Sequence, residues 1–223
     1  MEEIKETCYR GTRILLGNEK RLLLQKMTNC LMDNGYVEIQ MPIIQKREMF
    51  SNKVGEENQN MMFGVTEPKG RDLCLAPEYT AVIQQLAKTT FKHEKNLKVF
   101  YVQECFRGER PQAGRYRQFT QLGVEILNPT YDHMEQMIYL ANILIGYQIT
   151  PCSNVWYKEI YLNNLKIDSD VTRGLDYYKG GKGFEITYEA LGSSKQICGG
   201  GEYDEGVGFA IGIDRLLNIQ VDE

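Results

Sequence analysis

The sequence lacks the features that mark several specialised classes of protein. No apolar run approaches the roughly 18 residues that a membrane-spanning helix needs. No two of the six cysteines have the C-x-x-C spacing of a zinc or redox site, and there are only two histidines. The opening stretch MEEIKETCYR is polar and acidic, unlike a secretory or mitochondrial signal. We therefore predict a cytoplasmic protein that does not contact a membrane, holds no metal through its own side chains and keeps its cysteines reduced.

A net positive charge is also missing, which limits how this protein could bind nucleic acid. The formal net charge is -4 and the sequence pI is about 5.4. A surface that coats a polynucleotide needs the opposite balance, although a local basic patch could still contact one polynucleotide end. With 223 residues, 42% of them hydrophobic, the chain is long enough to build a sizeable core. We treat residues 1–223 as a single domain.

The distribution of apolar residues predicts an α+β fold. Helical patterns cover residues 18–34, with Asn18 as N-cap and Gly35 after the end, a stretch that Pro77 opens at its first position, and residues 132–148. Strand-like patterns cover residues 37–44, 97–106, 119–127, 183–190 and 194–200, and residues 208–218 begin apolar and become helical. Residues 45–69 and 149–172 look irregular, the first with a short hairpin. Because strands outnumber helices in a mixed order, we expect an antiparallel β-sheet flanked by helices.

Positive charge is nevertheless concentrated in one stretch, FRGERPQAGRYRQF (106–119). It holds four of the eleven arginines and joins two β-rich runs, so we expect a long hairpin connection. Arginine suits a bidentate grip on phosphate, and an aromatic ring beside it can stack a base. The residues therefore favour a nucleotide site, with phosphate on Arg107, the base against Phe119 and Glu109 accepting a purine amino proton. A solvated hairpin without a ligand is the alternative that this stretch alone leaves open.

Two further features bear on an anion site, each with an ordinary alternative. Arg215 lies in the first turns of a helix that follows GVGFAIG, where a cation opposes the helix dipole unless an anion is bound. It could also simply extend into solvent. The glycines of CGGGEYD (198–204) allow close approach of a ligand, but they also suit a tight turn, and they match neither a P-loop nor a dinucleotide fingerprint.

Five segments together resemble the catalytic core of class II aminoacyl-tRNA synthetases, and the histidyl branch most closely. They are YRGTRILLG (9–17), GYVEIQMPII (35–44), FRGERPQAGRYRQFTQLGVE (106–125), VTRGLDYY (171–178) and GFAIGIDRL (208–216). The second is similar to motif 1, the third to motif 2 (about 100–127), the fourth to the histidyl signature and the fifth to motif 3 (about 208–217). The matches are colinear over nearly the whole chain. The resemblance implies a class II antiparallel sheet flanked by helices, with motif 1 at a homodimer interface.

The resemblance assigns the binding of ATP to residues of motifs 2 and 3. It implies that Arg107 binds the α-phosphate, Glu109 contacts the adenine amino group and Phe119 stacks the ring. Arg215 would hold the γ-phosphate, and Arg115 would also lie at the ATP site.

The resemblance further implies a reaction and a place for the acceptor. Arg107, Arg173 and Arg215 would be catalytic, because fixed arginines and the Mg²⁺ that accompanies ATP stabilise charge on the phosphoryl oxygens. Gln112 and Arg115 lie in the loop that faces the acceptor end of tRNA in this family.

The amino acid is assigned to a third set of residues by the same resemblance. The set is Glu78, Thr80, Gln121, Glu125, Arg173, Tyr177, Tyr178 and Tyr203. Glu78 and Thr80, in LAPEYTA, resemble the P-E-x-T that holds the α-amino group. Gln121 would orient the substrate. Glu125 and Tyr178 would bind the two imidazole nitrogens, an arrangement that suits histidine.

Several positions depart from the family pattern. Ala76 and Tyr79 replace an arginine and a glycine, and Glu202 stands at the arginine position of G-G-R-Y-D. We expect Tyr79 to add bulk beside the amino-group site and Glu202 to reverse a charge near the pocket. Only 48 positions separate Glu125 from Arg173, and the chain ends soon after motif 3, so we expect neither the insertion domain nor the anticodon-binding domain.

The function implied is activation of an amino acid, histidine by the match, to its adenylate with ATP and Mg²⁺, followed by transfer to tRNA(His). Two alternatives stay open. The acceptor could be a protein, a carrier protein or a small amine instead of tRNA. The chain could also be a non-catalytic paralogue, like the regulatory subunit of ATP phosphoribosyltransferase in histidine biosynthesis. The matching residue types at Glu78, Arg107, Arg173 and Arg215 favour an enzyme.

Overall fold

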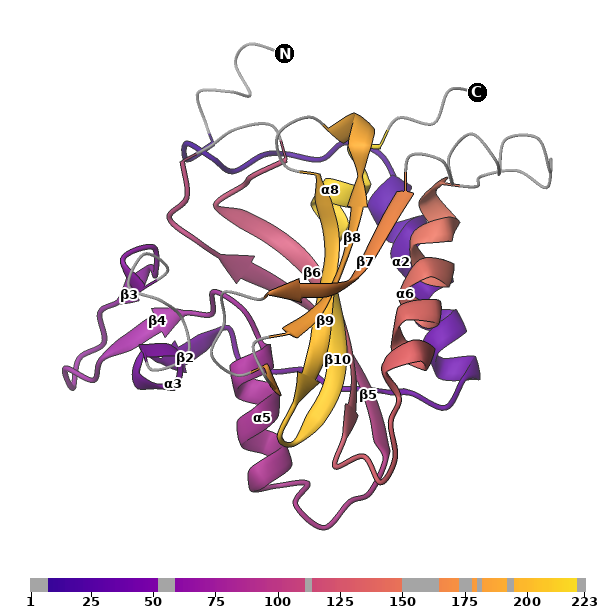
Figure 1. Ribbon diagram of the computed structural model, residues 1–223. Helices are drawn as coiled ribbons and strands as arrows, with labels where there is room; N and C mark the ends of the chain where they lie inside the picture. The colour runs from indigo at the N-terminus through magenta and orange to yellow at the C-terminus, as the bar shows by residue number, and fades with distance from the viewer. Residues whose placement is uncertain are drawn as a thin grey trace.

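Seven strands form the main sheet of the structure, a computed structural model that describes residues 8–51, 59–110, 114–149, 165–172, 178–179, 182–191 and 195–219. Their order is β1-β5-β6-β10-β9-β8-β7 (Figure 1). The strands are β1 (Val37–Glu38), β5 (Leu97–Phe106), β6 (Gln118–Leu127), β7 (Leu165–Thr172), β8 (Lys182–Tyr188), β9 (Gln196–Tyr203) and β10 (Gly206–Gly212). Only β1 pairs in parallel, with β5, and every other neighbouring pair in this sheet is antiparallel. The predicted α+β fold with an antiparallel sheet is confirmed.

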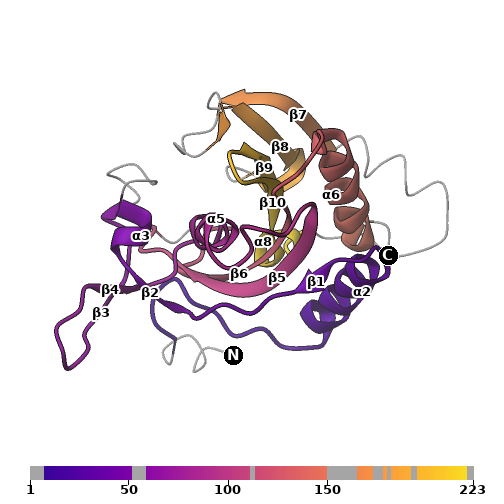
Figure 2. The ribbon, with the colours of Figure 1, turned by 90° about the horizontal axis from the view of Figure 1, so that it is seen from below.

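Helices cover both faces of this sheet. Helices α2 (Glu19–Asp33) and α6 (Met134–Ile149) contact each other on one face, and α5 (Thr80–Lys88) packs on the other. A small sheet, in the order β2-β4-β3, lies beside α5 and is made of β2 (Ile44–Lys46), β4 (Leu73–Leu75) and β3 (Gly64–Val65). Short helical turns complete the description: α3 (Glu48–Ser51), η2 (Glu189–Leu191) and α8 (Ile213–Leu216). Figure 2 separates α2 and α6, at the right, from α5 and the small sheet.

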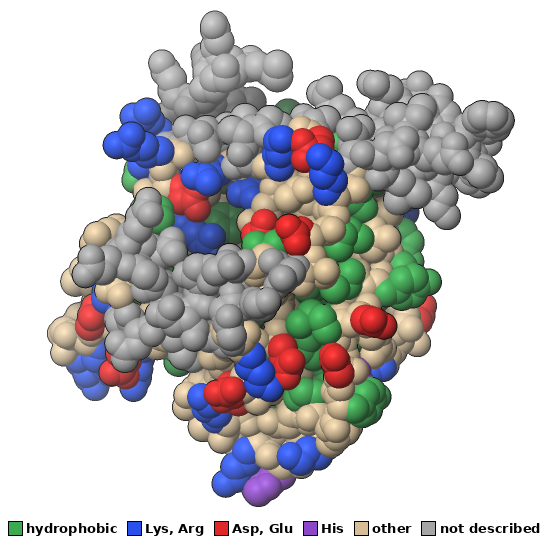
Figure 3. All heavy atoms as spheres, viewed as in Figure 1, with side chains coloured by type: hydrophobic (Ala, Val, Ile, Leu, Met, Phe, Trp, Pro, Cys, Tyr) green, Lys and Arg blue, Asp and Glu red, His purple; other side chains and the backbone are tan. Residues whose placement is uncertain are grey.

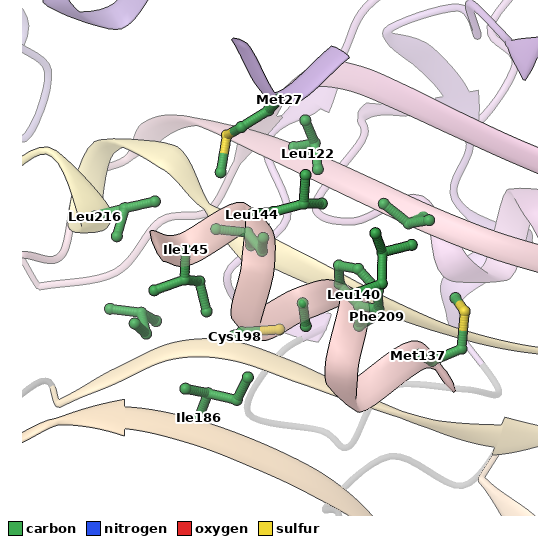
Figure 4. Close-up of a cluster of buried hydrophobic side chains, with 14 of the residues drawn as sticks. Met27, Leu122, Met137, Leu140, Leu144, Ile145, Ile186, Cys198, Phe209 and Leu216 are labelled. Carbon is green, nitrogen blue, oxygen red and sulfur yellow. The ribbon is translucent and has the colours of Figure 1, made fainter. Parts of the chain in front are cut away.

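The larger core lies between the main sheet and the α2–α6 layer. Alternate residues of β6 and β10, such as Leu122 and Phe209, are buried against α6 residues such as Leu144 (Figure 4). The intervening residues therefore face the opposite side of the sheet. Burying one side in this way fixes the register and leaves the other side for a site.

Several element predictions are confirmed and three are wrong. Residues 37–44 are not one strand, since only Val37–Glu38 and Ile44 lie in strands, and these belong to different sheets. Helix α2 begins after Asn18, which holds the N-cap position without a side-chain hydrogen bond, and ends before Gly35, whose φ of 79° suits a helix terminus. Helix α5 begins at Thr80 rather than at Pro77. The stretch 149–172 is not irregular throughout, since its last eight residues form the edge strand β7.

Among the helices described, none is long and apolar enough to cross a membrane. The five cysteines described are free thiols.

Candidate active site

A cavity of about 330 Å³ opens on the face of the main sheet opposite α2 and α6. Nine of the predicted site residues line it: Glu78, Thr80, Arg107, Glu109, Arg115, Phe119, Gln121, Tyr178 and Arg215. They come from the start of α5, the hairpin between β5 and β6, strand β6, the segment before β8, and α8. Two more, Glu125 and Tyr203, are buried without lining the cavity, and Arg173, Tyr177 and Gln112 lie outside the described residues. Figure 3 shows lysine and arginine side chains gathered around a recess in the upper left of that view.

The alternation of strand β6 puts its site residues on one face. Phe119, Gln121 and Glu125 are spaced by even numbers, so their side chains point away from the α2–α6 core. Across the ladder, Glu125 pairs with Gly208 and Gln121 pairs with Gly212. These small partners leave the space above β10 open for β6 side chains and for a ligand.

Two fixed guanidinium groups mark one half of the cavity. Arg107 donates from Nε to the Pro77 carbonyl oxygen at 2.8 Å and lies 5.2 Å from the centroid of the Phe119 ring. Arg215 donates to the carbonyl oxygens of Gly114 at 2.9 Å and Gln196 at 2.6 Å. Burial lowers the pKa of Arg215 from its ordinary value, but a guanidinium stays charged at neutral pH. Each group still has N–H donors for an anion.

Glu109 lies between Arg107 and Arg115, and one of its oxygens accepts no hydrogen bond within the part of the chain that is described. Its carboxylate is 3.9 Å from Arg107 and 3.6 Å from Arg115. Its Oε2 atom, which faces Arg115 at 3.6 Å, is buried and accepts no hydrogen bond from any described residue. A buried acceptor without a donor is costly, so this atom fits a ligand that donates, such as the amino group of adenine.

The other half of the site is a buried carboxyl group surrounded by tyrosines. Tyr203 donates a 3.0 Å hydrogen bond to Oε2 of Glu125. The pKa of Glu125 is raised to about 8, mainly by burial and also by the nearby charge of Glu78, while the Tyr203 bond opposes the shift. The hydroxyl of Tyr101 is also buried here and has no hydrogen-bond partner among the described residues. Burial also raises the pKa of Tyr101 and Tyr203, so both hydroxyls keep their protons.

Tyr101 was not predicted as a site residue, although the sequence held a signal for it. It lies on strand β5 directly opposite Gly123, and a Cβ on that glycine would lie 2.0 Å from its ring. An aromatic residue opposite a glycine in a strand pair is a sign that the ring lies across the sheet on the glycine side.

Glu78 has a local structural role in addition to its place in the cavity. Its two carboxylate oxygens accept hydrogen bonds from the backbone N–H groups of Thr80 at 2.7 Å and Ala81 at 3.1 Å. It therefore caps α5, which explains why the helix begins after Pro77. Burial raises the pKa of Glu78, while these backbone bonds and Arg107 lower it. A carboxylate oxygen can accept more than one bond, so an ammonium group can also bind here.

Comparisons with known proteins show the family to which the chain belongs. A family model described as "Histidyl-tRNA synthetase" matches residues 18–145, more than half of the chain. The chain belongs to the histidyl-tRNA synthetase family. One relative, the histidine–tRNA ligase of Methanosarcina acetivorans, is 28% identical over an alignment of 308 positions that covers 94% of this chain and 74% of that protein. Because the alignment is longer than the 223 residues of this chain, the relative has residues inside the matched region that this chain lacks.

Solved structures of this kind share the fold. The apo histidyl-tRNA synthetase of S. aureus superposes with a TM-score of 0.67 at 22% identity, covering 95% of this chain and 69% of that one. A Bacillus halodurans protein titled "ATP phosphoribosyltransferase regulatory subunit/histidyl-tRNA synthetase" gives a TM-score of 0.65 at 17% identity, covering 93% and 81%. The fold is therefore that of the class II aminoacyl-tRNA synthetase core.

Two positions that depart from the usual histidyl-tRNA synthetase pattern do not affect the cavity as expected. Tyr79 does not line it; its side chain is fully buried, packs 5.5 Å from Tyr101 and donates to the Glu104 carbonyl oxygen at 3.3 Å. Glu202 lies outside it as well, paired with Lys179 at 2.6 Å. Neither residue adds bulk or charge to the cavity lining.

The helix-dipole argument for Arg215 is also wrong. Helix α8 has four residues and Arg215 is the third, so the side chain is no closer to the start of the helix than to its end. The two backbone carbonyl groups that it contacts explain its position instead.

Proposed function

We propose that the chain activates histidine with ATP, forming histidyl-adenylate and pyrophosphate. The observation that supports this best is that two chemically different groups of residues lie close together. Glu125 and Tyr203 do not line the cavity, but the charges of two lining residues, Glu78 and Tyr178, act on them. The arginines and Glu109 suit a nucleotide, and the buried Glu125 with its tyrosines suits a small ring that can exchange hydrogen bonds on both sides. Membership of the family makes histidine the candidate ring.

The proposed reaction transfers the adenylyl group to a carboxylate. An oxygen of the histidine carboxylate attacks the α-phosphorus, a new oxygen–phosphorus bond forms, and the bond to the bridging oxygen breaks as pyrophosphate leaves. Arg107 would stabilise the negative charge that develops on the α-phosphoryl oxygens, and Arg215 would hold the departing end. Both guanidinium groups are already fixed by backbone carbonyls, so little reorganisation is needed during the reaction.

Magnesium would bind with the nucleotide and add positive charge at the phosphates. The described residues contain no cluster of three carboxylate, histidine or cysteine side chains. We therefore propose that the ATP phosphates carry the ion to the site.

Selection of histidine would depend on the hydrogen bonds around Glu125. Tyr203 already occupies one carboxyl oxygen of Glu125, which leaves the other oxygen for an imidazole nitrogen. Tyr178, buried and at the cavity wall, would contact the second nitrogen. A substrate that cannot form these bonds would leave buried polar groups unsatisfied, which costs more than the loss of one contact.

Exchange of labelled pyrophosphate into ATP tests this proposal. We expect exchange that depends on histidine and on none of the other standard amino acids. Arg107→Lys should reduce the rate strongly because a lysine cannot replace the fixed planar group, whereas Arg71→Lys on the surface should not. No exchange with any amino acid would overturn the assignment as an adenylating enzyme.

The acceptor and the assembly state complete the proposal. We propose tRNA as the acceptor of the histidyl group. Transfer of labelled histidine to tRNA would support this, and exchange without transfer would favour a non-tRNA acceptor.

We also propose a homodimer formed through the exposed apolar residues around β1, which is an edge strand of the main sheet. These are Ile14, Leu16, Val37, Ile43 and Ile44.

A further inference from the structure

The segment of residues 9–13, which precedes α2, lies along one wall of the cavity. This wall is the end of the β5–β6 hairpin, residues 114–117, together with α8. In Figure 1 the chain before α2 crosses the top of the molecule beside α8. Segments far apart in the sequence are therefore adjacent where the nucleotide is proposed to bind.

Backbone and side-chain hydrogen bonds attach this segment to the hairpin. The N–H of Arg117 donates to the Gly11 carbonyl oxygen at 2.7 Å. The guanidinium of Arg117 donates to the Tyr9 hydroxyl at 2.8 Å and to the Arg10 carbonyl oxygen at 3.2 Å. Gly11 has a φ of 89°, a conformation that glycine adopts without strain.

Arg13 makes the connection that reaches the cavity lining. Its guanidinium donates to the Tyr116 hydroxyl at 2.8 Å and lies 4.0 Å from the centroid of the Tyr116 ring. It also donates to Oδ1 of Asp214 at 2.9 Å and to the Asp214 carbonyl oxygen at 3.1 Å. A further bond reaches Asn218 at 3.1 Å. Tyr116 and Asp214 both line the cavity, so one side chain joins two parts of its wall.

Asp214 extends the connection into the sheet. It is only 5% exposed, and its Oδ2 atom accepts from the N–H of Thr120 at 2.5 Å. Its chain neighbour Arg215 donates to the Gly114 carbonyl oxygen, so the hairpin is attached at Gly114 and again at Tyr116. Lys20 also lies 3.9 Å from Oδ2. A buried carboxylate with several partners holds its neighbours in one geometry more firmly than an exposed ion pair does.

We propose that residues 9–13 are a brace that holds the hairpin against the nucleotide half of the cavity, with Arg13 as its principal positioning residue. The inference rests on the proposed binding of ATP in this cavity. Arg13 itself does not line the cavity and acts through Tyr116 and Asp214. Its loss should therefore weaken ATP more than histidine, because among the described residues no hydrogen bond or ion pair joins Glu125 to the brace.

Calorimetric titration of ATP and of histidine into variants tests this. We expect Arg13→Ala to weaken ATP binding by about tenfold and histidine binding by less than about twofold. Arg13→Lys keeps the charge but not the planar fork, so its affinity for ATP should fall between those of Arg13→Ala and the wild type. Tyr116→Phe removes only a hydroxyl and should weaken ATP alone by a few fold, which also covers the case in which Arg13→Ala does not fold.

Arg47→Ala is the matched control. Arg47 has a similarly limited exposure, 28% against 22% for Arg13, and pairs with Asp72 away from the cavity. Its variant should bind both ligands as the wild type does. Unchanged ATP affinity in Arg13→Ala, or an equal loss for ATP and histidine, would overturn the brace.

The two proposals fail in different ways. A wild type that binds ATP but exchanges no pyrophosphate contradicts the adenylation, while the calorimetric comparison still decides the brace. A wild type that does not bind ATP overturns both.

Discussion

Glu125 illustrates how a single residue can lower stability while serving a site. Its carboxyl group is almost fully buried, accepts one hydrogen bond from Tyr203 and has Gly208 directly beside it. With a pKa of about 8 it is mostly neutral at neutral pH. A histidine ring that donates to it would favour the ionised form, so substrate binding and proton release from Glu125 should be coupled.

This produces a pH-dependent cost of folding that Glu125→Gln should remove. A carboxyl whose pKa rises from 4.5 to about 8 on folding binds more protons in the folded chain, so stability falls as pH rises between those values. The variant should therefore be more stable than the wild type by about 3 kcal/mol at pH 7 and by less than about 1 kcal/mol at pH 5. Urea unfolding at the two pH values measures this. Glu94→Gln, at an exposed position, serves as the control, and a difference that does not grow with pH would contradict the account.

Substitution of Glu78 should cause two separable losses, one of stability and one of affinity for the amino acid. Glu78→Ala removes both hydrogen bonds that the carboxylate accepts at the start of α5, and it should lower the free energy of unfolding by about 1–2 kcal/mol. Glu78→Gln keeps one acceptor, so it should recover much of this stability but not the affinity for an α-ammonium group. Thermal unfolding together with the histidine dependence of exchange separates the two effects. Equal behaviour of the two variants in both measurements would show that the capping and the binding roles are not distinct.

At the scale of elements, the glycines of β10 have no side chains and so leave space on the face of the sheet that bears the site. A Cβ at Gly208 would lie 1.6 Å from Oε2 of Glu125, so Gly208→Ala must displace the carboxyl group. We expect the KM for histidine to rise by at least about tenfold, while the KM for ATP changes by less than about threefold.

Gly146→Ala is the control for this prediction. A Cβ there meets nothing within 4 Å, and the residue is inside α6, so the variant should keep its activity and gain up to about 1 kcal/mol of stability. An unchanged KM for histidine in Gly208→Ala would show that Glu125 does not contact the substrate.

The elements also show which parts of the fold could be predicted. Strands β5 and β6 and helix α6 follow from long apolar patterns, because their side chains are buried in the hydrophobic clusters on the two faces of the sheet. Strand β7 was missed since LKIDSDVT is an edge strand with largely exposed side chains and a register shift, so little apolar periodicity remains. The start of α5 was misplaced because its cap is the Glu78 carboxylate, a residue type that also suits a first helical turn.

The site was predictable in part, for a related reason. Motif residues on β6 and in the hairpin converge because strand alternation fixes their direction. The Tyr79 side chain is buried against Tyr101, and the Glu202 side chain forms an ion pair with Lys179. No local sequence pattern reveals either contact, so the positions of these side chains outside the cavity could not be predicted. The contacts of Arg13 join residues about 100 and 200 positions away, so they became visible only in three dimensions.

At the scale of the whole molecule, the proposed dimer makes a prediction about the edges of the sheet. Val37 on β1 is 58% exposed, and Val37→Lys should shift the protein toward monomers because a buried unpaired lysine is costly at an apolar interface. Sedimentation velocity measures the change. Ile167→Lys, on the opposite edge strand β7, is the control and should leave the assembly unchanged. A protein that is monomeric before any substitution would contradict the proposed interface.

The central claim is that the cavity binds the nucleotide and that Glu125, buried beside it, selects imidazole together with Tyr178 at the cavity wall. It is tested most directly by calorimetry with stable sulfamoyl analogues of two aminoacyl-adenylates, one histidyl and one phenylalanyl. The two rings are similar in size, but only imidazole can form hydrogen bonds with Glu125 and Tyr178. We predict that the histidyl analogue binds at least about 100-fold more tightly than the phenylalanyl analogue, and far more tightly than histidine alone. Equal affinity for the two analogues would contradict the account.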